Sequence, residues 1–300
     1  MMLELNEKKI RKGKPLGLPY QGSKKKISKK IVEIIKQNFG TDKPVYDIFG
    51  GGGAITAECL INGLEVHYND LDHTITDMFQ RVLSMDREFL KTLIVSRDEF
   101  FKIREKENKT VDDELKLLIN SFGNDRKTYL YSRKFSDLKY NLAIEIIKKH
   151  DVFDGYKKTE TYKNAYRPFD VGKEKKNQVL NQLKPLQQLE RLQNININNL
   201  EITNHDYTHF SYLSDAIIYL DPPYENTILE GYSISEFDNQ SFYDWAYEMS
   251  KKNIVLISSY EISDKRFECV YEFKTARSTF QGGTNNNKTE KLFMVKKGEE

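Results

Sequence analysis

Apolar residues recur at two different spacings along the chain, and the spacings distinguish helices from strands. Isoleucines three or four residues apart between 27 and 35 predict a helix that ends before Gly40. Short apolar runs at 44–49 and 64–68 predict strands, and the segment 54–64 has a helical pattern. Strands that alternate with helices predict a mainly parallel sheet with helices on both faces.

A long middle segment departs from this alternation. From about residue 85 to residue 199 the pattern changes to charged helical segments without a strand signal. The sheet pattern then resumes, with predicted strands at 200–203, 216–220, 254–259, 269–275 and 291–296. The last two are expected to form an antiparallel hairpin at the sheet edge. We therefore expect a sheet domain of residues 1–84 and 200–300 and an inserted helical lobe of residues 85–199.

Composition and charge fit this division. Of the 300 residues, 38% are hydrophobic and 31% are charged, so the surface is large relative to the core. A net charge of +2 does not by itself predict a nucleic-acid partner, but the stretch 8–30 contains many cations and no acid. Such a stretch is either a solvated face or a phosphate-binding surface. The charge pattern alone leaves both open.

Several classes of protein are not expected. No apolar run is long enough for a membrane span, and the first residues lack the apolar core of a signal peptide. Cys59 and Cys269 lie far apart without metal-type spacing, which suits a reducing compartment. His205 and His209 have no further ligands nearby, so no metal site is expected. A cytoplasmic protein is therefore predicted.

Four glycines at 50–53 follow the strand at 44–49 and precede a helix. In such a turn a ligand can approach the backbone, and an acid near the end of the next strand, here Asp70, is placed to bind ribose hydroxyls. The pattern is not a P-loop, and Thr56 stands where a dinucleotide fingerprint has its third glycine. A nucleoside without a pyrophosphate is the predicted ligand. A glycine turn without a ligand is the alternative.

A second motif ends the apolar run at 216–220. Asp221 is followed by Pro222, Pro223 and Tyr224. Because proline has no amide hydrogen to give a sheet, the pair ends the strand and keeps the chain extended. Considered alone, an Asp-Pro step is more typical of a turn than of a site.

Taken together, these motifs resemble a known family. The chain resembles the S-adenosylmethionine-dependent DNA adenine-N6 methyltransferases of the Dam type, in the D12 class. The resemblance rests on three motifs in this order: Asp47-x-Phe49-x-Gly51-x-Gly53, then Asp70, then DPPY. Further stretches agree. Residues 20–24 resemble the family's N-terminal cofactor motif, and residues 204–207 resemble its acid-aromatic pair. Residues 255–258 and 277–292 resemble its closing strands. Cofactor motifs, then an insert, then DPPY is the order of the family's alpha group.

The resemblance implies both a fold and a cofactor. The fold would be an α/β, Rossmann-like methyltransferase fold with a mixed seven-stranded sheet, a terminal antiparallel hairpin and an inserted helical target-recognition lobe. In this family Asp47, Phe49 and Gly51 would shape the methionine pocket, Asp70 would bind the ribose and Asp206 the adenine of S-adenosylmethionine. The implied cofactor-binding residues are Tyr20, Gly22, Lys24, Asp47, Phe49, Gly51, Gly53, Asp70, Asp206 and Tyr207. Many members have tryptophan in the place of Tyr20.

The DPPY motif then acquires a proposed chemistry. The sulfonium methyl is strongly electrophilic, so the protein mainly needs to hold the adenine amino group with its lone pair toward the methyl. Asp221 and the Pro222 carbonyl would each accept one amino hydrogen, which stabilises positive charge developing on the nitrogen. Pro223 keeps that carbonyl in an extended segment, and Tyr224 offers a face on which the base stacks.

A base inside a duplex has to be flipped to reach such a pocket, and phosphate contacts help to offset the cost. Candidate DNA-binding residues are Lys24, Arg126, Lys127, Tyr129, Arg133, Lys134 and Arg277. The cations between 126 and 134 equally fit an ordinary solvated helix face. The chain lacks the FNVPFGR-like recognition stretch of the Dam type, so the resemblance does not extend to a GATC target.

Double-stranded DNA is thus the expected partner, and the resemblance implies a prokaryotic or phage enzyme. No segment is typical of a nuclease, so a restriction endonuclease would be a separate protein. An RNA-base or protein-amide methyltransferase is the first alternative, although amide-methylating relatives usually carry asparagine in the place of Asp221. A catalytically silent nucleic-acid binding module on the same fold is the second, and Asp70, Asp206 and Asp221 argue against it.

Overall fold

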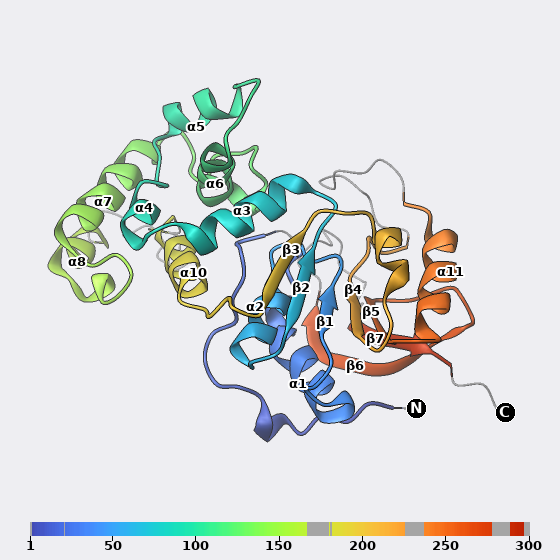
Figure 1. Cartoon of the computed structure of the whole chain (residues 1–300). Coiled ribbons are helices and arrows are strands. Elements are labelled where there is room, and N and C mark those ends of the chain that lie inside the picture. Colours follow the sequence, from blue (N-terminus) through green and yellow to red (C-terminus); the bar gives the residue numbers. More distant parts are fainter. Residues whose placement is uncertain are drawn as a thin grey trace. The chain divides into compact units, whose positions relative to one another are not determined.

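The computed structural model describes residues 2–20, 22–166, 180, 182–225, 237–277 and 289–296 (Figure 1). The chain divides into two compact units. The sheet unit comprises Met1–Pro15, Lys24–Thr76 and Asn196–Glu300, and the helical unit comprises Leu16–Ser23 and Asp77–Ile195. The sequence placed the first long boundary after residue 84 and did not assign residues 16–23 to the helical lobe.

The sheet unit is built on a seven-stranded mixed sheet with the order β3-β2-β1-β4-β5-β7-β6. The first five strands in this order are parallel, and β7 runs antiparallel to both β5 and β6. The strands are β1 (Val45–Asp47), β2 (Val66–Asn69), β3 (Leu200–Thr203), β4 (Ile217–Leu220), β5 (Ile254–Ser259), β6 (Phe267–Arg277) and β7 (Thr289–Val295). The mixed seven-stranded sheet with its terminal hairpin is therefore confirmed. Residues 278–288, between the two hairpin strands, lie outside the described residues.

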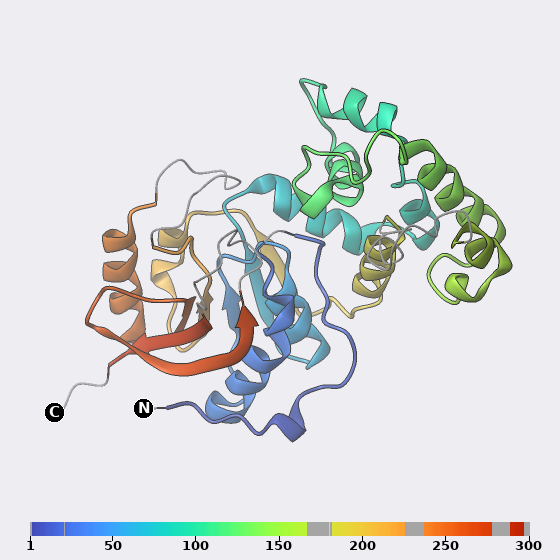
Figure 2. The ribbon, with the colours of Figure 1, turned by 180° about the vertical axis from the view of Figure 1, so that it is seen from behind.

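Helices cover both faces of this sheet. The chain moves from β1 to β2 through α2 (Ala54–Ile61) in one direction and from β4 to β5 through α11 (Asn239–Ser250) in the other. Because crossovers between parallel strands are right-handed, the two helices lie on opposite faces. Figures 1 and 2 show α1 (Ser28–Phe39) beside α2, with α11 across the sheet from both.

The central strands are apolar because both of their faces are buried. All four residues of β4 are buried, and in β5 only Ile254 is partly exposed. Ile218 and Leu220 pack with Phe242 of α11, so the alternation of side chains along β4 directs Tyr219 to the other face.

The helical unit contains seven described helices. They are α3 (His73–Ser84), α4 (Arg87–Lys91), α5 (Arg97–Arg104), α6 (Val111–Asn120), α7 (Ser136–Lys149), α8 (Glu160–Tyr166) and α10 (Leu183–Gln193), and α3 begins in the sheet unit. Short 3₁₀ turns lie at Glu7–Lys9, Lys24–Lys26, Phe122–Asn124, Tyr156–Lys158 and Tyr207–Tyr212. Along the part of the chain that is described, no helix is long and apolar enough to cross a membrane.

A buried polar network holds the interior of the helical unit. The Asn120 side-chain amide donates to the Leu93 carbonyl at 2.8 Å. Gln182 Nε2 lies 3.0 Å from both Asn120 Oδ1 and the Tyr129 hydroxyl. All three side chains are buried, and pairing buried polar groups with one another avoids a large desolvation cost. Tyr129 is therefore part of this interior.

The N-terminal basic stretch is fixed to the sheet unit by some of its own cations. Arg11 Nε and Nη2 donate to the two carboxylate oxygens of Glu58 at 2.8 and 2.7 Å, and only 1% of the Glu58 side chain is exposed. Lys29 Nζ donates to the carbonyls of Arg11 and Gly13, at 2.9 Å each. These two cations hold the segment against α1 and α2.

Arg11→Ala should destabilise the sheet unit, because it leaves the Glu58 carboxylate buried without its bidentate partner. We expect a loss of about 2 kcal/mol in the free energy of unfolding, since hydrogen bonds to charged groups contribute about 1.5–3 kcal/mol. Chemical denaturation measures it. Lys30→Ala, which removes the exposed pair with Glu7, is the control and should cost less than about 1 kcal/mol. Equal losses in the two variants would contradict this role of Arg11.

Candidate active site

The glycine turn after β1 is packed too closely for side chains. A Cβ on Gly50 would lie 2.3 Å from Cε2 of Tyr68, so residue 50 has to be glycine for the turn to pack on β2. Gly51 has a φ of 48°, a left-handed conformation that favours glycine. The Tyr68 hydroxyl donates to the Gly51 carbonyl at 2.7 Å. Gly53 precedes α2 as its N-cap.

Asp70 lies directly against this turn. Its Oδ2 accepts from the Gly51 amide at 2.8 Å and its Oδ1 from the Asp72 amide at 2.9 Å. Burial, together with the charges of Asp72 and Asp221, raises the pKa of Asp70 to about 6. The acid that the sequence placed near the turn therefore contacts it, at the carboxyl end of β2.

Asp47, at the end of β1, is almost completely buried behind the turn. Its Oδ2 accepts from the Thr56 hydroxyl at 2.6 Å and from the Thr56 amide at 3.1 Å. Burial raises the pKa of Asp47 to about 7, and the charges of Asp221 and Asp70 act in the same direction. Thr56 replaces the third glycine of a dinucleotide fingerprint, and the structure shows it as the partner of Asp47. In the sequence alone, Thr56 is visible only as a departure from that fingerprint.

Asn69 is a positioning residue that belongs to none of the predicted motifs. Its side chain is buried and joins the ends of three strands. Nδ2 donates to the carbonyls of Ile48 at 3.0 Å and His205 at 2.9 Å, and Oδ1 accepts from the His205 amide at 2.8 Å and the Thr203 hydroxyl at 3.0 Å. Its position at the end of a predicted strand was the one signal in the sequence for such a role. Its partners in and after β3 are distant in the sequence, so no local pattern links them to Asn69.

The acid-aromatic pair after β3 divides into two roles. Asp206 is exposed and caps the 3₁₀ turn Tyr207–Tyr212, where its Oδ1 accepts from the Thr208 amide at 3.0 Å. The Tyr207 ring is stacked with that of Phe49, with centroids 6.1 Å apart and an interplanar angle of 29°. It also meets Trp245 edge to face at 5.1 Å. The structure thus brings together Phe49 and Tyr207 at the carboxyl ends of β1 and β3.

The DPPY motif follows β4 directly, as predicted. Pro222 and Pro223 are buried, while Asp221 and Tyr224 are half-buried. The Tyr224 hydroxyl lies within donating distance of Asp221 Oδ1, at 3.1 Å, and of Glu290 Oε2, at 2.7 Å. Its ring meets Tyr260 edge to face at 4.7 Å. Both the acid and the aromatic ring are therefore held by specific partners.

Lys24 belongs to the same cluster. Its Nζ lies 2.8 Å from Asp221 Oδ2, 3.7 Å from Glu290 Oε1 and 5.0 Å from the centroid of the Tyr224 ring. We refer to Lys24, Asp221, Tyr224 and Glu290 as the DPPY cluster. Burial raises the pKa of Glu290, whereas Lys24 lowers it. No spacing in the sequence links Glu290 to this site.

The other predicted residues belong to the helical unit or to the end of β6. Tyr20 and Gly22 belong to the helical unit. In that unit Arg126 pairs with Glu114 at 3.1 Å, and Tyr129 is buried. Lys127, Arg133 and Lys134 are exposed there. Arg277 is the last residue of β6 and pairs in register with Thr289.

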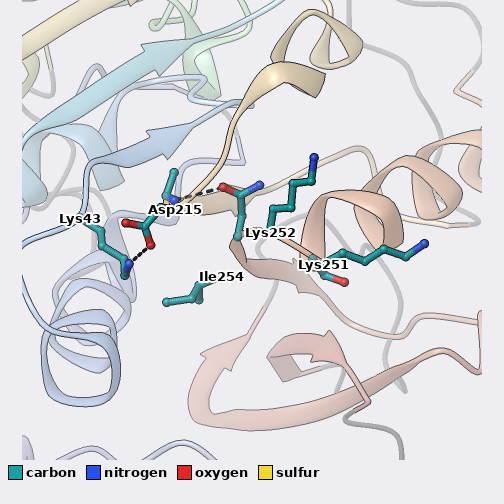
Figure 3. Close-up of a pocket in the computed structure, with 8 residues that line it drawn as sticks. Lys43, Asp215, Lys251, Lys252 and Ile254 are labelled. Atoms are coloured by element: carbon teal, nitrogen blue, oxygen red, sulfur yellow. Dashed lines mark hydrogen bonds and ion pairs between the residues drawn. The ribbon is translucent and has the colours of Figure 1, made fainter.

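A surface pocket of about 210 Å³ lies at the opposite, amino ends of the strands (Figure 3). Lys43 forms an ion pair with Asp215 across it, and the Ala216 amide donates to Asn253 Oδ1 at 3.1 Å. None of the predicted site residues lines this pocket. Within the described ranges, no group of three or more His, Cys, Asp or Glu side chains is arranged to hold a metal ion.

The mixed sheet, with the glycine turn and the DPPY motif at one edge, defines an α/β methyltransferase fold. The model of the D12 class N6 adenine-specific DNA methyltransferase family matches residues 20–282, and the chain belongs to this family.

Two solved structures align with most of the chain at low identity. "Putative methyltransferase yhhF" from Escherichia coli is 9% identical, with 93% of this chain and 90% of that chain covered and a TM-score of 0.35. A second, the "putative methylase HI0767" from Haemophilus influenzae, is 10% identical, with coverages of 89% and 95% and a TM-score of 0.32. A search of curated proteins finds no match.

Asp47→Asn should change how stability depends on pH. Because burial raises the pKa of Asp47 to about 7, the folded chain retains a proton that the unfolded chain releases above about pH 4. The contribution of Asp47 to stability should therefore fall as pH rises from about 4 to 7. The variant should lose less of its Tm over this range in thermal unfolding.

The exposed Asp42 provides the control, and Asp42→Asn should follow the wild-type curve. Parallel Tm curves for Asp47→Asn and wild type would show that Asp47 is not protonated in the fold.

Proposed function

We propose that the chain transfers a methyl group from S-adenosylmethionine to the N6 amino group of a flipped adenine in double-stranded DNA, as in the Dam-type alpha group. One observation carries the proposal. The parallel pairing of β1 with β4 sets Asp47 opposite Tyr219, so the glycine turn and Asp221 leave neighbouring strands at the same edge. The charge of Asp221 also acts on the pKa values of both Asp47 and Asp70.

The residues at this edge fit the cofactor. A nucleoside needs a turn that a ligand can approach closely, and the packing at Gly50 and the conformation of Gly51 supply one. Asp70 lies at this turn as the candidate acceptor for ribose hydroxyls, and the rings of Phe49 and Tyr207 add an apolar wall. Bound S-adenosylmethionine would supply the electrophilic methyl group.

Asp221 is the candidate group that holds the target amino group. It follows the fully buried strand β4, and the two buried prolines after it restrict the backbone. A carboxylate fixed in this way can accept an amino hydrogen and stabilise positive charge that develops on the nitrogen during transfer. The Pro222 carbonyl is the proposed second acceptor.

Tyr224 is the candidate stacking surface for the flipped base. Its hydroxyl is held by the carboxylates of Asp221 and Glu290, and its ring is buttressed by Tyr260. A ring whose position is fixed loses little conformational freedom when a base stacks on it.

DNA contacts are proposed for the helical unit, mainly through the exposed cations Lys127, Arg133 and Lys134. The guanidinium of Arg126 is already paired with Glu114, and Tyr129 is buried in the polar network. Phosphate contacts are expected from flexible exposed cations, which position a protein on the duplex without reading its sequence.

The reaction and the target are tested together. The chain is expressed in cells that lack adenine methylation, and their DNA is sequenced for N6-methyladenine. Purified protein is then assayed for transfer from labelled S-adenosylmethionine to duplex DNA and to RNA. Methyladenine in one recurring DNA sequence is expected. Transfer to RNA alone, or to no nucleic acid, would refute the proposal.

Asp221→Ala should lower kcat by at least about 100-fold, the typical effect of losing a preorganised group that stabilises transition-state charge. The Kd for S-adenosylmethionine, measured by calorimetry, should change less than about threefold, because Asp221 acts on the amino group of the target adenine. A tenfold change in Kd corresponds to about 1.4 kcal/mol, so the expected change in binding free energy is smaller than that. Asp42→Ala, at an exposed position, should leave both unchanged. A variant that loses only cofactor affinity would contradict the assigned role.

Tyr224→Ala should weaken binding of the target base more than binding of the cofactor. Base stacking on an aromatic ring contributes about 1–3 kcal/mol, so KM for DNA should rise about tenfold or more. Fluorescence from a 2-aminopurine at the target position should also report less flipping. Similar losses of affinity for DNA and for S-adenosylmethionine would argue against this division of roles.

A further inference from the structure

Glu290 is a largely buried carboxylate whose charge has no role yet in the proposed chemistry. It lies in β7, and 12% of its side chain is exposed. Its Oε2 accepts from the Tyr224 hydroxyl at 2.7 Å, and its Oε1 lies 3.7 Å from Lys24 Nζ. Because a carboxylate is costly to bury, a second one beside Asp221 requires compensation, which Lys24 provides.

The Lys24 ammonium is shared unequally by these two carboxylates. It lies 2.8 Å from Asp221 Oδ2, a close charge-assisted hydrogen bond, and 3.7 Å from Glu290 Oε1. Lys24 therefore binds the same carboxylate that is proposed to accept from the adenine amino group. An uncharged amino group competes poorly with an ammonium for a carboxylate oxygen, since a hydrogen bond between charged partners is the stronger one.

We propose that Glu290 is a positioning residue for methyl transfer: it takes over the Lys24 ammonium when the target amino group binds Asp221, and it keeps the Tyr224 hydroxyl in place. This inference rests on the proposed function of Asp221. The end of a lysine side chain is flexible, and Glu290 Oε1 is already close to it. The ammonium remains paired in both arrangements, so the amino group can replace it at Asp221 without leaving the ammonium unpaired. The Asp221 carboxylate is then left to stabilise the positive charge that develops on the amino nitrogen.

Glu290 has to be ionised to take over the Lys24 ammonium from Asp221. The titratable groups that act on it are Lys24, Asp221, Tyr224 and Tyr219. Burial raises its pKa above the usual value for a glutamate, against the opposing effect of Lys24. As pH falls through this raised pKa, Glu290 becomes neutral and can no longer hold the ammonium. The contribution of Glu290 to the reaction should therefore disappear at acid pH.

The test is Glu290→Gln, which preserves the size of the side chain and an acceptor for Tyr224 but removes the charge. We expect kcat to fall about tenfold at pH 8, equivalent to about 1.4 kcal/mol, with little change in the Kd for S-adenosylmethionine. The ratio of wild-type to variant kcat should approach one as pH is lowered. Glu290→Asp, which retains the charge, should recover most of kcat.

Glu272→Gln is the matched control, because Glu272 is exposed on the paired strand β6 and accepts from Thr289. It should behave as wild type. In a Lys24→Met background no ammonium remains to be moved, so adding Glu290→Gln should change kcat less than about threefold.

Several results would overturn the role of Glu290 while leaving the proposed function intact: a kcat ratio that does not depend on pH, additive effects of the Lys24 and Glu290 variants, or an aspartate variant as slow as the glutamine variant. A glutamine variant that loses folding or cofactor binding, with no recovery of kcat in Glu290→Asp, would make Glu290 merely structural. Absence of transfer by the wild-type chain would overturn the proposed function and this inference with it.

Discussion

The parallel pairing of β1 with β4 is the constraint on which the candidate site depends. Strands of one sheet that run in the same direction end at the same edge, and these two are neighbours in register. The turn that begins at Gly50 and the motif that begins at Asp221 therefore meet, although about half of the chain separates them. The sheet pairing alone brings the two motifs together. The insert between them is not needed for this contact, so it can form a separate unit.

This edge collects acids, and their burial decides its electrostatics. The pKa values of Asp47, Asp70 and Glu290 are all raised, with burial as the largest cause. Such an environment suits a positively charged ligand, which lowers the cost of ionised carboxylates nearby. The sulfonium of the proposed cofactor has this charge and loses it when the methyl group leaves, so the same acids that favour binding of the cofactor would hold the product less tightly.

Sequence periodicity was sufficient to predict individual helices and strands, because their apolar patterns are local in the sequence. The parallel sheet then followed from the order of these elements. The strands at 200–203 and 254–259 were predicted to the residue. Side-chain partners were not predictable in the same way. Asn69 binds His205, and Glu290 meets Tyr224, across sequence separations of 136 and 66 residues. Only the folded sheet makes these pairs neighbours, and no spacing rule links them.

The N-terminal basic stretch shows why charge runs alone predict function poorly. Arg11 and Lys29 fix the segment to the sheet unit, while Lys24 pairs with two carboxylates at the candidate site. Each of these cations has an internal partner, so the count of positive charges overstates what the stretch can offer to phosphates. The same holds for Tyr129, whose place among cations suggested a nucleic-acid surface but whose hydroxyl bonds within the core. A binding surface differs from a structural one in the charges that remain exposed after folding. The sequence shows how many charges a stretch has, but not which of them find internal partners.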